Sequence, residues 1–196
     1  MSEAAAGEVS EAAKPVLAAA AGEDTLGFLA GDWNVLRWIS DHRTGTDGEF
    51  RGTASFRPRP ARSSPHPESP DPVSPDPVSP DPVSPDPVSP GSGELEYTEH
   101  GELAFGTHQG PAFRSLVYTG RADGAADVRF ADGRPFFRLD LRTGHCQAEH
   151  PCKTDQYLVT VTRQGRDCFT ERWQVAGPEK DYEMTATYTR AAPSDR

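Results

Sequence analysis

The sequence predicts one all-β domain, an antiparallel up-and-down barrel of about eight to eleven strands that begins with a short helical plug. Two observations lead to this fold class. Segments of alternating apolar and polar residues recur along the chain, and turn-forming residues separate them at roughly eight-to-twelve-residue intervals. Because nearly every link is short, neighbouring strands should pair antiparallel in sequence order. Closing this meander on itself would remove its exposed edges.

The alternation is clearest near the C-terminus. In residues 167–176 the odd-numbered side chains from Phe169 to Val175 are mostly apolar or aromatic, whereas the even-numbered ones are mostly polar. In residues 182–190 the even-numbered side chains from Tyr182 to Tyr188 are the apolar or aromatic ones. Successive side chains of a strand point to opposite faces, so each segment is expected to turn one face toward a core.

The elements are expected in the following places. One or two turns of helix near residues 26–30 could close one end of the barrel. Strands are expected at residues 33–41, 49–57, 94–100, 102–105, 112–120, 126–131, 135–141, 145–150, 156–164, 167–176 and 182–190. Turns, each with a residue that tolerates positive φ or has φ preset, are expected at His100-Gly101, Asp123-Gly124, Asp132-Gly133, Thr143-Gly144, Gln164-Gly165 and Gly177-Pro178.

Three segments are expected to be disordered. Residues 1–24 are rich in Ala, Glu and Gly, and residues 61–93 are mostly Pro, Ser, Asp and Val, so neither can bury enough surface to offset its ordering entropy. Residues 191–196 form a short tail. A single domain over residues 25–190, interrupted by the 61–93 insert, therefore holds all three Trp, all five Tyr and all nine Phe.

The insert carries four copies of Ser-Pro-Asp-Pro-Val at residues 69–88. Two prolines in each five-residue unit favour extended polyproline II that stays solvated. We interpret the repeat as a tolerated expansion of a hairpin loop. The alternative is an interaction domain that recruits a proline-binding partner through this loop.

Charge and cysteine content exclude several classes of partner. The formal net charge is −10, most of it carried by the N-terminal segment and the insert, and no run of Lys or Arg is present. Nucleic acid and anionic membranes are therefore not expected partners. Residues 15–21 are too short and too weakly apolar to span a bilayer, and the three Cys have no disulfide spacing. A cytoplasmic protein is expected.

The first predicted strand begins with a recognisable motif. Residues 28–33 (FLAGDW) contain Gly31 and Trp33 and resemble the Gly-x-Trp signature at the first strand of lipocalins and related calycin barrels. In those barrels the Trp plugs the closed end, and an Arg from a late strand commonly packs across it. The resemblance implies that Trp33 closes one end here.

A wider pattern covers residues 25–190 except the insert. It consists of residues 28–33, Asp132-Gly133 with Phe136, Phe137, Leu139 and Asp140, His150-x-Cys152-x-x-Asp155-x-Tyr157, and Trp173-x-Val175-x-Gly177-Pro178-x-Lys180-Asp181-Tyr182. This pattern resembles a bacterial family catalogued as domain of unknown function 6314, which implies a lipocalin-like fold and brings no established activity. Structural roles are expected for Gly31, Trp33, Asp155, Gly177, Pro178, Lys180, Asp181 and Tyr182.

Arginines within apolar segments suggest a ligand site. Arg37, Arg114, Arg138 and Arg172 each lie in a predicted strand, and an inward-facing guanidinium would offer a fork to a carboxylate or other anion. The alternative is outward Arg, or internal ion pairs such as Arg138 with Asp140. The first hypothesis is a barrel whose interior binds a small, partly apolar or anionic molecule. Its expected lining is Arg37, Arg114, Tyr118, His150, Tyr157 and Trp173.

The second hypothesis is an enzyme of isomerase or hydrolase type. His150, Asp155, Tyr157 and Lys180 could move a proton or polarise a carbonyl if the barrel brings them together. The simpler interpretation of residues 177–182 is a tight turn in which Lys180 is solvated and Tyr182 begins a strand. No catalytic residue is assigned.

Neither a metal nor a cofactor is predicted. His145, Cys146, His150 and Cys152 crowd one segment, but zinc needs four nitrogen or sulfur ligands and Cys168, His100 and His108 lie at no recognised spacing. Some related ten-stranded barrels hold haem through a histidine near the chain end, whereas this chain has no His after His150. A partly buried structural imidazole, donating to a carboxylate such as Asp155, is favoured.

Overall fold

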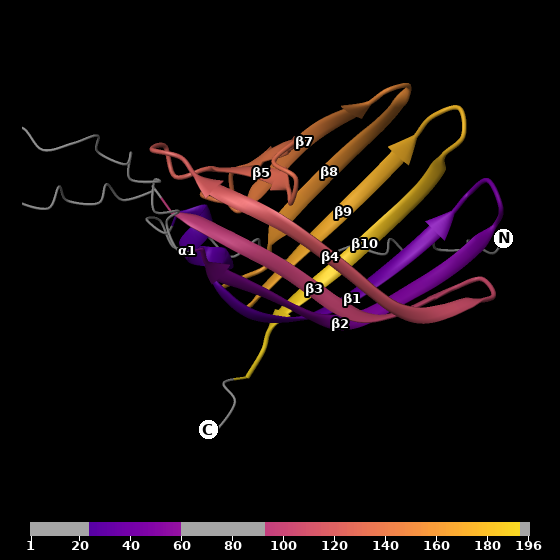
Figure 1. Ribbon diagram of the computed structural model, residues 1–196, viewed down its shortest axis with the longest axis horizontal. Helices are drawn as coiled ribbons and strands as arrows, with labels where there is room; N and C mark the ends of the chain where they lie inside the picture. The colour runs from indigo at the N-terminus through magenta and orange to yellow at the C-terminus, as the bar shows by residue number, and fades with distance from the viewer. Residues whose placement is uncertain (1–23, 60–92, 193–196) are drawn as a thin grey trace, which may run out of the picture.

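The computed structural model describes residues 24–59 and 93–192 of the chain. These residues form a short helix and ten antiparallel strands in one sheet that curls into a nearly closed barrel (Figure 1). The elements are α1 (Thr25–Leu29), β1 (Gly31–Asp41), β2 (Thr46–Pro58), β3 (Glu94–Phe105), β4 (His108–Gly120), β5 (Ala126–Phe130), β6 (Pro135–Leu139), β7 (His145–Cys152), β8 (Asp155–Arg163), β9 (Cys168–Ala176) and β10 (Asp181–Arg190). The predicted all-β fold and up-and-down order are confirmed. The Pro-rich repeat lies outside the described residues, as do the segments predicted to be disordered (1–24, 61–93 and 191–196) except residues 24, 93, 191 and 192.

Strands that follow one another in the chain are neighbours in the sheet from β1 to β6 and again from β7 to β10, and β1 also pairs with β10. The order is β6-β5-β4-β3-β2-β1-β10-β9-β8-β7, so the first and last strands pair with each other. Trp33 is the register partner of Arg190, and Asp41 that of Tyr182. In Figure 1, α1 lies at one end of the barrel and four hairpin turns lie at the other. These are called the closed end and the open end below.

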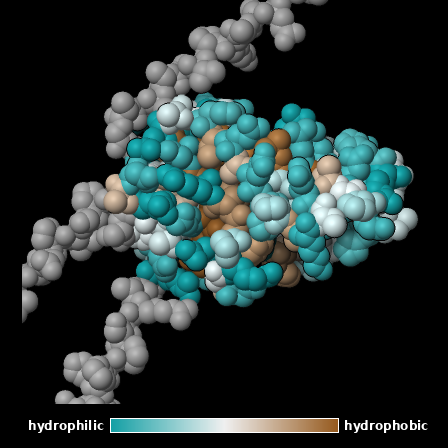
Figure 2. Space-filling view, turned by 90° about the horizontal axis from the view of Figure 1, so that it is seen from above, coloured by the Kyte–Doolittle hydropathy of each residue, from teal (hydrophilic) through white to brown (hydrophobic). Residues whose placement is uncertain are grey.

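The predicted alternation decides which side chains fill the interior. On β9, Phe169, Glu171, Trp173 and Val175 are buried, whereas the residues between them are more exposed. Burial of this aromatic and aliphatic face supplies the main driving force for folding. Figure 2 shows apolar side chains gathered in the middle of one face of the molecule, between polar borders.

Most predicted turns are confirmed, and one is wrong. Gly124 and Gly133 have φ of 80° and 87°, the left-handed conformation that glycine tolerates. His100-Gly101 is not a turn, because β3 is a single strand that continues through it. Gly101 lies opposite Gly52, and a Cβ on Gly101 would come within 2.3 Å of the Arg51 carbonyl oxygen. This glycine therefore permits a close approach of two strands rather than a reversal of the chain.

The closed end is sealed as the lipocalin resemblance implies. Asp24 caps α1 by accepting a hydrogen bond from Gly27 N at 2.6 Å. The Trp33 indole donates to the Leu29 carbonyl at 2.8 Å, and the Arg190 guanidinium lies 3.9 Å from the Trp33 ring centroid. Arg190 also donates to the Phe28 carbonyl at 2.8 Å, so one arginine fixes the helix over the barrel end.

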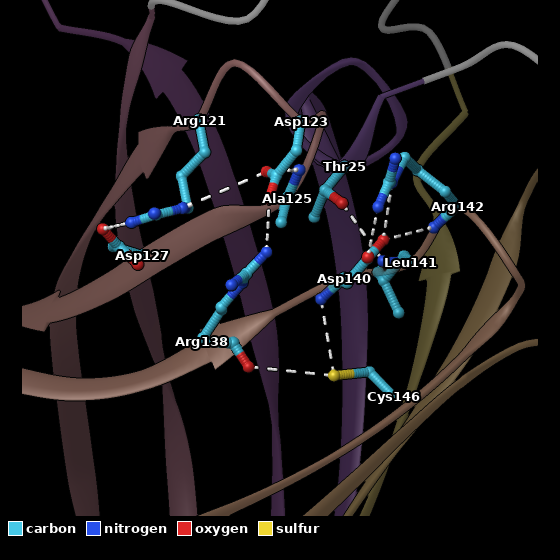
Figure 3. A network of polar contacts seen from close by, with 10 residues as sticks. All are labelled: Thr25, Arg121, Asp123, Ala125, Asp127, Arg138, Asp140, Leu141, Arg142 and Cys146. Carbon is cyan, nitrogen blue, oxygen red and sulfur yellow. Dashed lines mark hydrogen bonds and ion pairs between the residues drawn. The ribbon is translucent and has the colours of Figure 1, made fainter.

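The barrel has a seam between β6 and β7. Within residues 24–59 and 93–192, no backbone ladder joins these two strands. Instead, the Cys146 Sγ on β7 accepts from Asp140 N at 3.4 Å and donates to the Arg138 carbonyl at 3.7 Å (Figure 3). Leu141 N donates to Thr25 Oγ1 at 3.1 Å and ties the end of the seam to α1. Among the residues described, no helix has the length and apolarity needed to cross a membrane.

Candidate ligand-binding site

A buried ion pair spans the middle of the barrel. Arg37 on β1 donates two hydrogen bonds to the Glu99 carboxylate on β3, at 2.8 and 2.7 Å. Both residues are buried, with relative exposures of 7% and 4%. The hydroxyl of Tyr97 donates to Glu99 at 2.5 Å, and Arg37 reaches the hydroxyl of Tyr188 at 3.3 Å. Arg37 is inward-facing, as one hypothesis predicted, but its fork is occupied by a protein carboxylate.

The pair keeps both charges despite its burial. Burial alone would raise the pKa of Glu99, but the hydrogen bond and charge of Arg37, with the Tyr97 hydroxyl, lower it overall. Burial opposes the charge on Arg37, yet the surrounding groups together raise its pKa further above its ordinary value. Burial raises the pKa of Tyr97 as well, so its phenol stays protonated and can donate.

A second, looser pair lies beside the first. Arg114 on β4 approaches the Glu171 carboxylate on β9 at 3.6 Å. Glu171 accepts a 2.6 Å hydrogen bond from the Trp173 indole, which holds the carboxylate in place. The Glu171 side chain is buried, whereas 26% of the Arg114 side chain remains exposed. β5 pairs with β4 only over residues 116–120 and leaves Arg114 just beyond the covered part of β4.

The closed half of the interior is filled with rings. Phe56 lies 4.8 Å from Tyr97 and 5.3 Å from Tyr118 between ring centroids. Phe169 stacks on Tyr188 at 4.2 Å on the other side. Tyr118, one of the predicted lining residues, therefore belongs to this packed half.

The open half carries a second set of rings. Phe136 stacks on Trp173 at 5.1 Å with an interplanar angle of 8°. The His150 ring lies 5.0 Å from Phe136 and 6.0 Å from Tyr157. Phe130 lies 4.5 Å from Phe136. Of these rings only that of Trp173 is fully buried. We call Phe130, Phe136, His150, Tyr157 and Trp173 the aromatic wall.

A polar cluster lies at the rim of the open end. The Lys180 ammonium contacts Asp155 at 2.8 Å and donates to the Tyr157 hydroxyl at 2.7 Å. It is therefore not merely solvated, as the simpler interpretation of this turn held. Hydrogen bonds that Lys180 donates, first to Asp155 and then to Tyr157, raise the Lys180 pKa above its ordinary value, so Lys180 stays a cation. Gly177 is required here, because a Cβ would lie 2.0 Å from the Asp155 carboxylate.

Other predicted residues lie apart from the interior. Arg138 pairs with Asp123 at 2.5 Å, and the carboxylate of Asp140 is taken by Arg142, so the suggested Arg138–Asp140 ion pair is wrong. Arg172 faces outward and contacts Glu183. Successive side chains of a strand point to opposite faces of the sheet, and both arginines lie on the outward face of their strands.

The possible metal ligands do not converge. The His145 ring contacts the Thr162 hydroxyl at 3.1 Å, Cys146 belongs to the seam, and His150 belongs to the aromatic wall. Within the described part of the chain, no group of three or more His, Cys, Asp or Glu could hold a metal ion. The rings around His150 replace the carboxylate partner expected for it.

Sequence reasoning missed the acids and two rings of the site, Phe130 and Phe136. Glu171 was placed on the inward face of β9 by the alternation, so an acid flanked by Phe169 and Trp173 was a usable signal. Glu99 follows Tyr97 at the same spacing of two. The sequence pattern includes Phe136 only within a family motif and does not single out Phe130. The partners across the interior come from strands far apart in sequence, and no local pattern indicates them.

A solvent-open hollow of about 810 Å³ borders the aromatic wall at Phe130. Its lining includes Arg59, Glu94, Arg129 and Asp132, and Arg59 lies 4.0 Å from Glu94. Charged groups of both signs surround it, so it suits an apolar molecule less well than the aromatic wall does.

Two natural proteins of known structure share the fold. An S-type phycobiliprotein lyase from Guillardia theta superposes with a TM-score of 0.58 at 9% identity, over 86% of this chain and 92% of that one. A protein of unknown function from the DUF3598 family of Nostoc punctiforme gives a TM-score of 0.52 at 11% identity, over 92% of this chain. This chain spans about half, 53%, of that protein.

A redesigned β-barrel, mFAP1, bound to DFHBI, gives a TM-score of only 0.39 at 14% identity, over 86% of this chain and all of that one.

The comparison with protein families is consistent with the resemblance noted above. No curated protein matches the sequence. The model of the family of unknown function DUF6314 matches residues 29–190, and the chain belongs to that family.

Proposed function

We propose that this barrel binds one small, flat, partly apolar molecule against the aromatic wall in the open half of its interior. The observation that carries the proposal is the Phe136–Trp173 stack at 5.1 Å, beside rings of His150 and Tyr157 that are only half-buried. Rings in this state gain further burial when a planar molecule covers them. Aromatic surface of this kind supplies much of the binding energy in ligand sites.

The packing below the wall supports the same location. Tyr97, Tyr118 and Tyr188 fill the closed half, and the Arg37–Glu99 pair forms a floor whose hydrogen bonds are already made. A ligand in the open half would leave that floor intact. The shared fold with an S-type phycobiliprotein lyase supports the barrel alone, so the proposal depends on the side chains of this chain.

A neutral fluorescent probe tests the proposal. N-phenyl-1-naphthylamine should bind with a rise in fluorescence, and Phe136→Leu should weaken binding about fivefold to tenfold through loss of the ring stack. Phe113→Leu is the matched control, because Phe113 is 81% exposed and does not belong to the wall. Native mass spectrometry of protein purified from its own host should show a co-purified mass. No probe binding, or equal effects of the two substitutions, would contradict the proposal.

The second candidate is an enzyme that uses the rim cluster. It is favoured by the contacts of Lys180 with Asp155 and Tyr157, which lie within hydrogen-bonding distance. The raised Lys180 pKa suits a donor that polarises a carbonyl rather than a general base. His150 would complete the set across the 6.0 Å contact with Tyr157. Equal ester-hydrolysis or isomerisation rates for wild type and Lys180→Met would rule this candidate out.

The third candidate is partner recruitment through the Pro-rich insert, which lies outside the described residues. Deleting residues 69–90 and comparing captured partners with those of the full chain separates it from ligand binding. Loss of partners with unchanged probe binding would favour it, and an unchanged partner set would leave the insert as a spacer.

A further inference from the structure

Within residues 24–59 and 93–192, the interior cation Arg114 has only one ion-pair contact, a long one to Glu171. A guanidinium has five N–H donors, and those of Arg37 are directed to Glu99 and Tyr188. In the described part of the chain, Arg114 makes no hydrogen bond, and its contact with Glu171 at 3.6 Å is longer than one. Arg37, which binds Glu99, and Arg114, the register partner of Glu99, therefore differ sharply in how well their hydrogen-bond donors are satisfied.

The competing acids are already engaged. Glu99, the register partner of Arg114 across β3 and β4, binds Arg37 through both carboxylate oxygens. Glu171 accepts from the Trp173 indole at 2.6 Å, which fixes its Oε1 away from an ideal approach to Arg114. Moving Glu99 onto Arg114 would break its short buried hydrogen bonds with Arg37. Such exchanges cost free energy because buried polar groups are expensive to leave unpaired.

The position of Arg114 also makes it reachable. Its side chain is 26% exposed, in contrast to 9% for Arg37. It lies on the part of β4 that β5 does not cover, and through Glu171 it adjoins Trp173 of the aromatic wall. A molecule stacked on the wall could therefore present an oxygen to this guanidinium.

We infer that Arg114 is the anion-recognition residue of the barrel, and that the ligand is a flat apolar body carrying one carboxylate, sulfonate or similar oxyanion. This inference rests on the proposed function, because it places the anion at the end of the same site. The planar fork of Arg114 suits a bidentate contact with an oxyanion, which is stronger than a contact between neutral groups. In the protein without ligand, the negative charge of Glu171 balances the positive charge of Arg114.

A pair of matched probes tests the charge alone. N-phenyl-1-naphthylamine and 1-anilinonaphthalene-8-sulfonate share one anilinonaphthalene skeleton, and only the second carries a sulfonate. Arg114→Gln should weaken the sulfonate probe about tenfold or more and leave the neutral probe nearly unchanged. Arg172→Gln, which removes an outward arginine on β9, should change neither affinity.

A second variant predicts a change of opposite sign. Glu171→Gln keeps an acceptor for the Trp173 indole but removes the carboxylate that competes for Arg114, so the sulfonate probe should bind several-fold more tightly. A purely structural role of Arg114 would weaken both probes together. Thermal melting of each variant confirms that the fold is retained before binding is compared.

The outcomes separate this inference from the proposed function. If the neutral probe fails to bind the wild-type protein, the proposed function is wrong. If it binds, and neither Arg114→Gln nor Glu171→Gln alters the preference for the sulfonate, the proposed function stands and the anion-recognition role of Arg114 is overturned.

Discussion

Arg37 and Glu99, 62 residues apart in sequence, form a bidentate ion pair inside the barrel, and each side chain is at most 9% exposed. The pair joins β1 to β3 across the interior, although β2 separates these strands in the sheet. Desolvation of two charges is costly, and the additional bonds from Tyr97 and Tyr188 offset part of that cost. The attraction between the two charges and the cost of desolvating them nearly balance, so the intact pair adds little net stability.

Removing one partner of this pair should be strongly destabilising. Arg37→Met or Glu99→Gln leaves a buried group unpaired and should each lower the free energy of unfolding by about 3–5 kcal/mol. The double variant should cost much less than the sum, which chemical denaturation of all four proteins measures. The exposed pair of Arg172 with Glu183 is the control, at about 1 kcal/mol or less. Single-variant losses as small as the control's would refute a structural role for the buried pair.

The stability contributed by Glu99 should depend on pH. Its pKa is lower in the folded protein than its ordinary value, so this contribution is complete above the unfolded-state pKa of about 4.3 and is lost as the pH falls through the folded-state pKa. Denaturant unfolding between pH 7 and pH 3 should therefore show a smaller difference between wild type and Glu99→Gln at low pH. A difference that stays constant with pH would mean that Glu99 is not the titrating group.

A side chain at Gly101 should disrupt the pairing of β2 with β3. A Cβ there would lie 2.3 Å from the Arg51 carbonyl oxygen and 2.6 Å from the Gly52 Cα, and both are backbone atoms that cannot move alone. Gly101→Ala should lower the free energy of unfolding by about 1–3 kcal/mol. Gly110→Ala is the control, because its Cβ would meet only the His108 ring at 3.7 Å. Similar melting temperatures for the two variants would argue against a steric role for Gly101.

Replacing the insert by a short turn should preserve the fold. Arg59 N donates to the Glu94 carbonyl at 2.9 Å, so the ends of β2 and β3 already meet where residues 60–92 leave and rejoin the barrel. A four-residue turn in their place should raise the free energy of unfolding by roughly 1–2 kcal/mol through a smaller loop-closure entropy. Equilibrium unfolding measures this change. A marked loss of stability would show that the insert contributes to the domain.

Strand positions and faces could be predicted from the sequence because they obey short-range rules. Period-two alternation placed Trp173 and Tyr188 inside, and Gly124 and Gly133 marked turns through their tolerance of positive φ. The same rules failed at Gly101, because a glycine needed for a turn and one needed for a close strand approach look alike in sequence.

By itself, the sequence predicted an all-β barrel that starts with a helix and a Trp plug, and it named Arg37 and Arg114 as candidates for the interior without deciding which way they face. Only the tertiary structure decided that Arg37 is saturated by Glu99, that Arg114 is held loosely by Glu171, and that the seam falls between β6 and β7. The physical reason is that partners across a barrel are set by the tilt and stagger of the strands. Those quantities arise when the whole sheet closes, and no local stretch of residues encodes them.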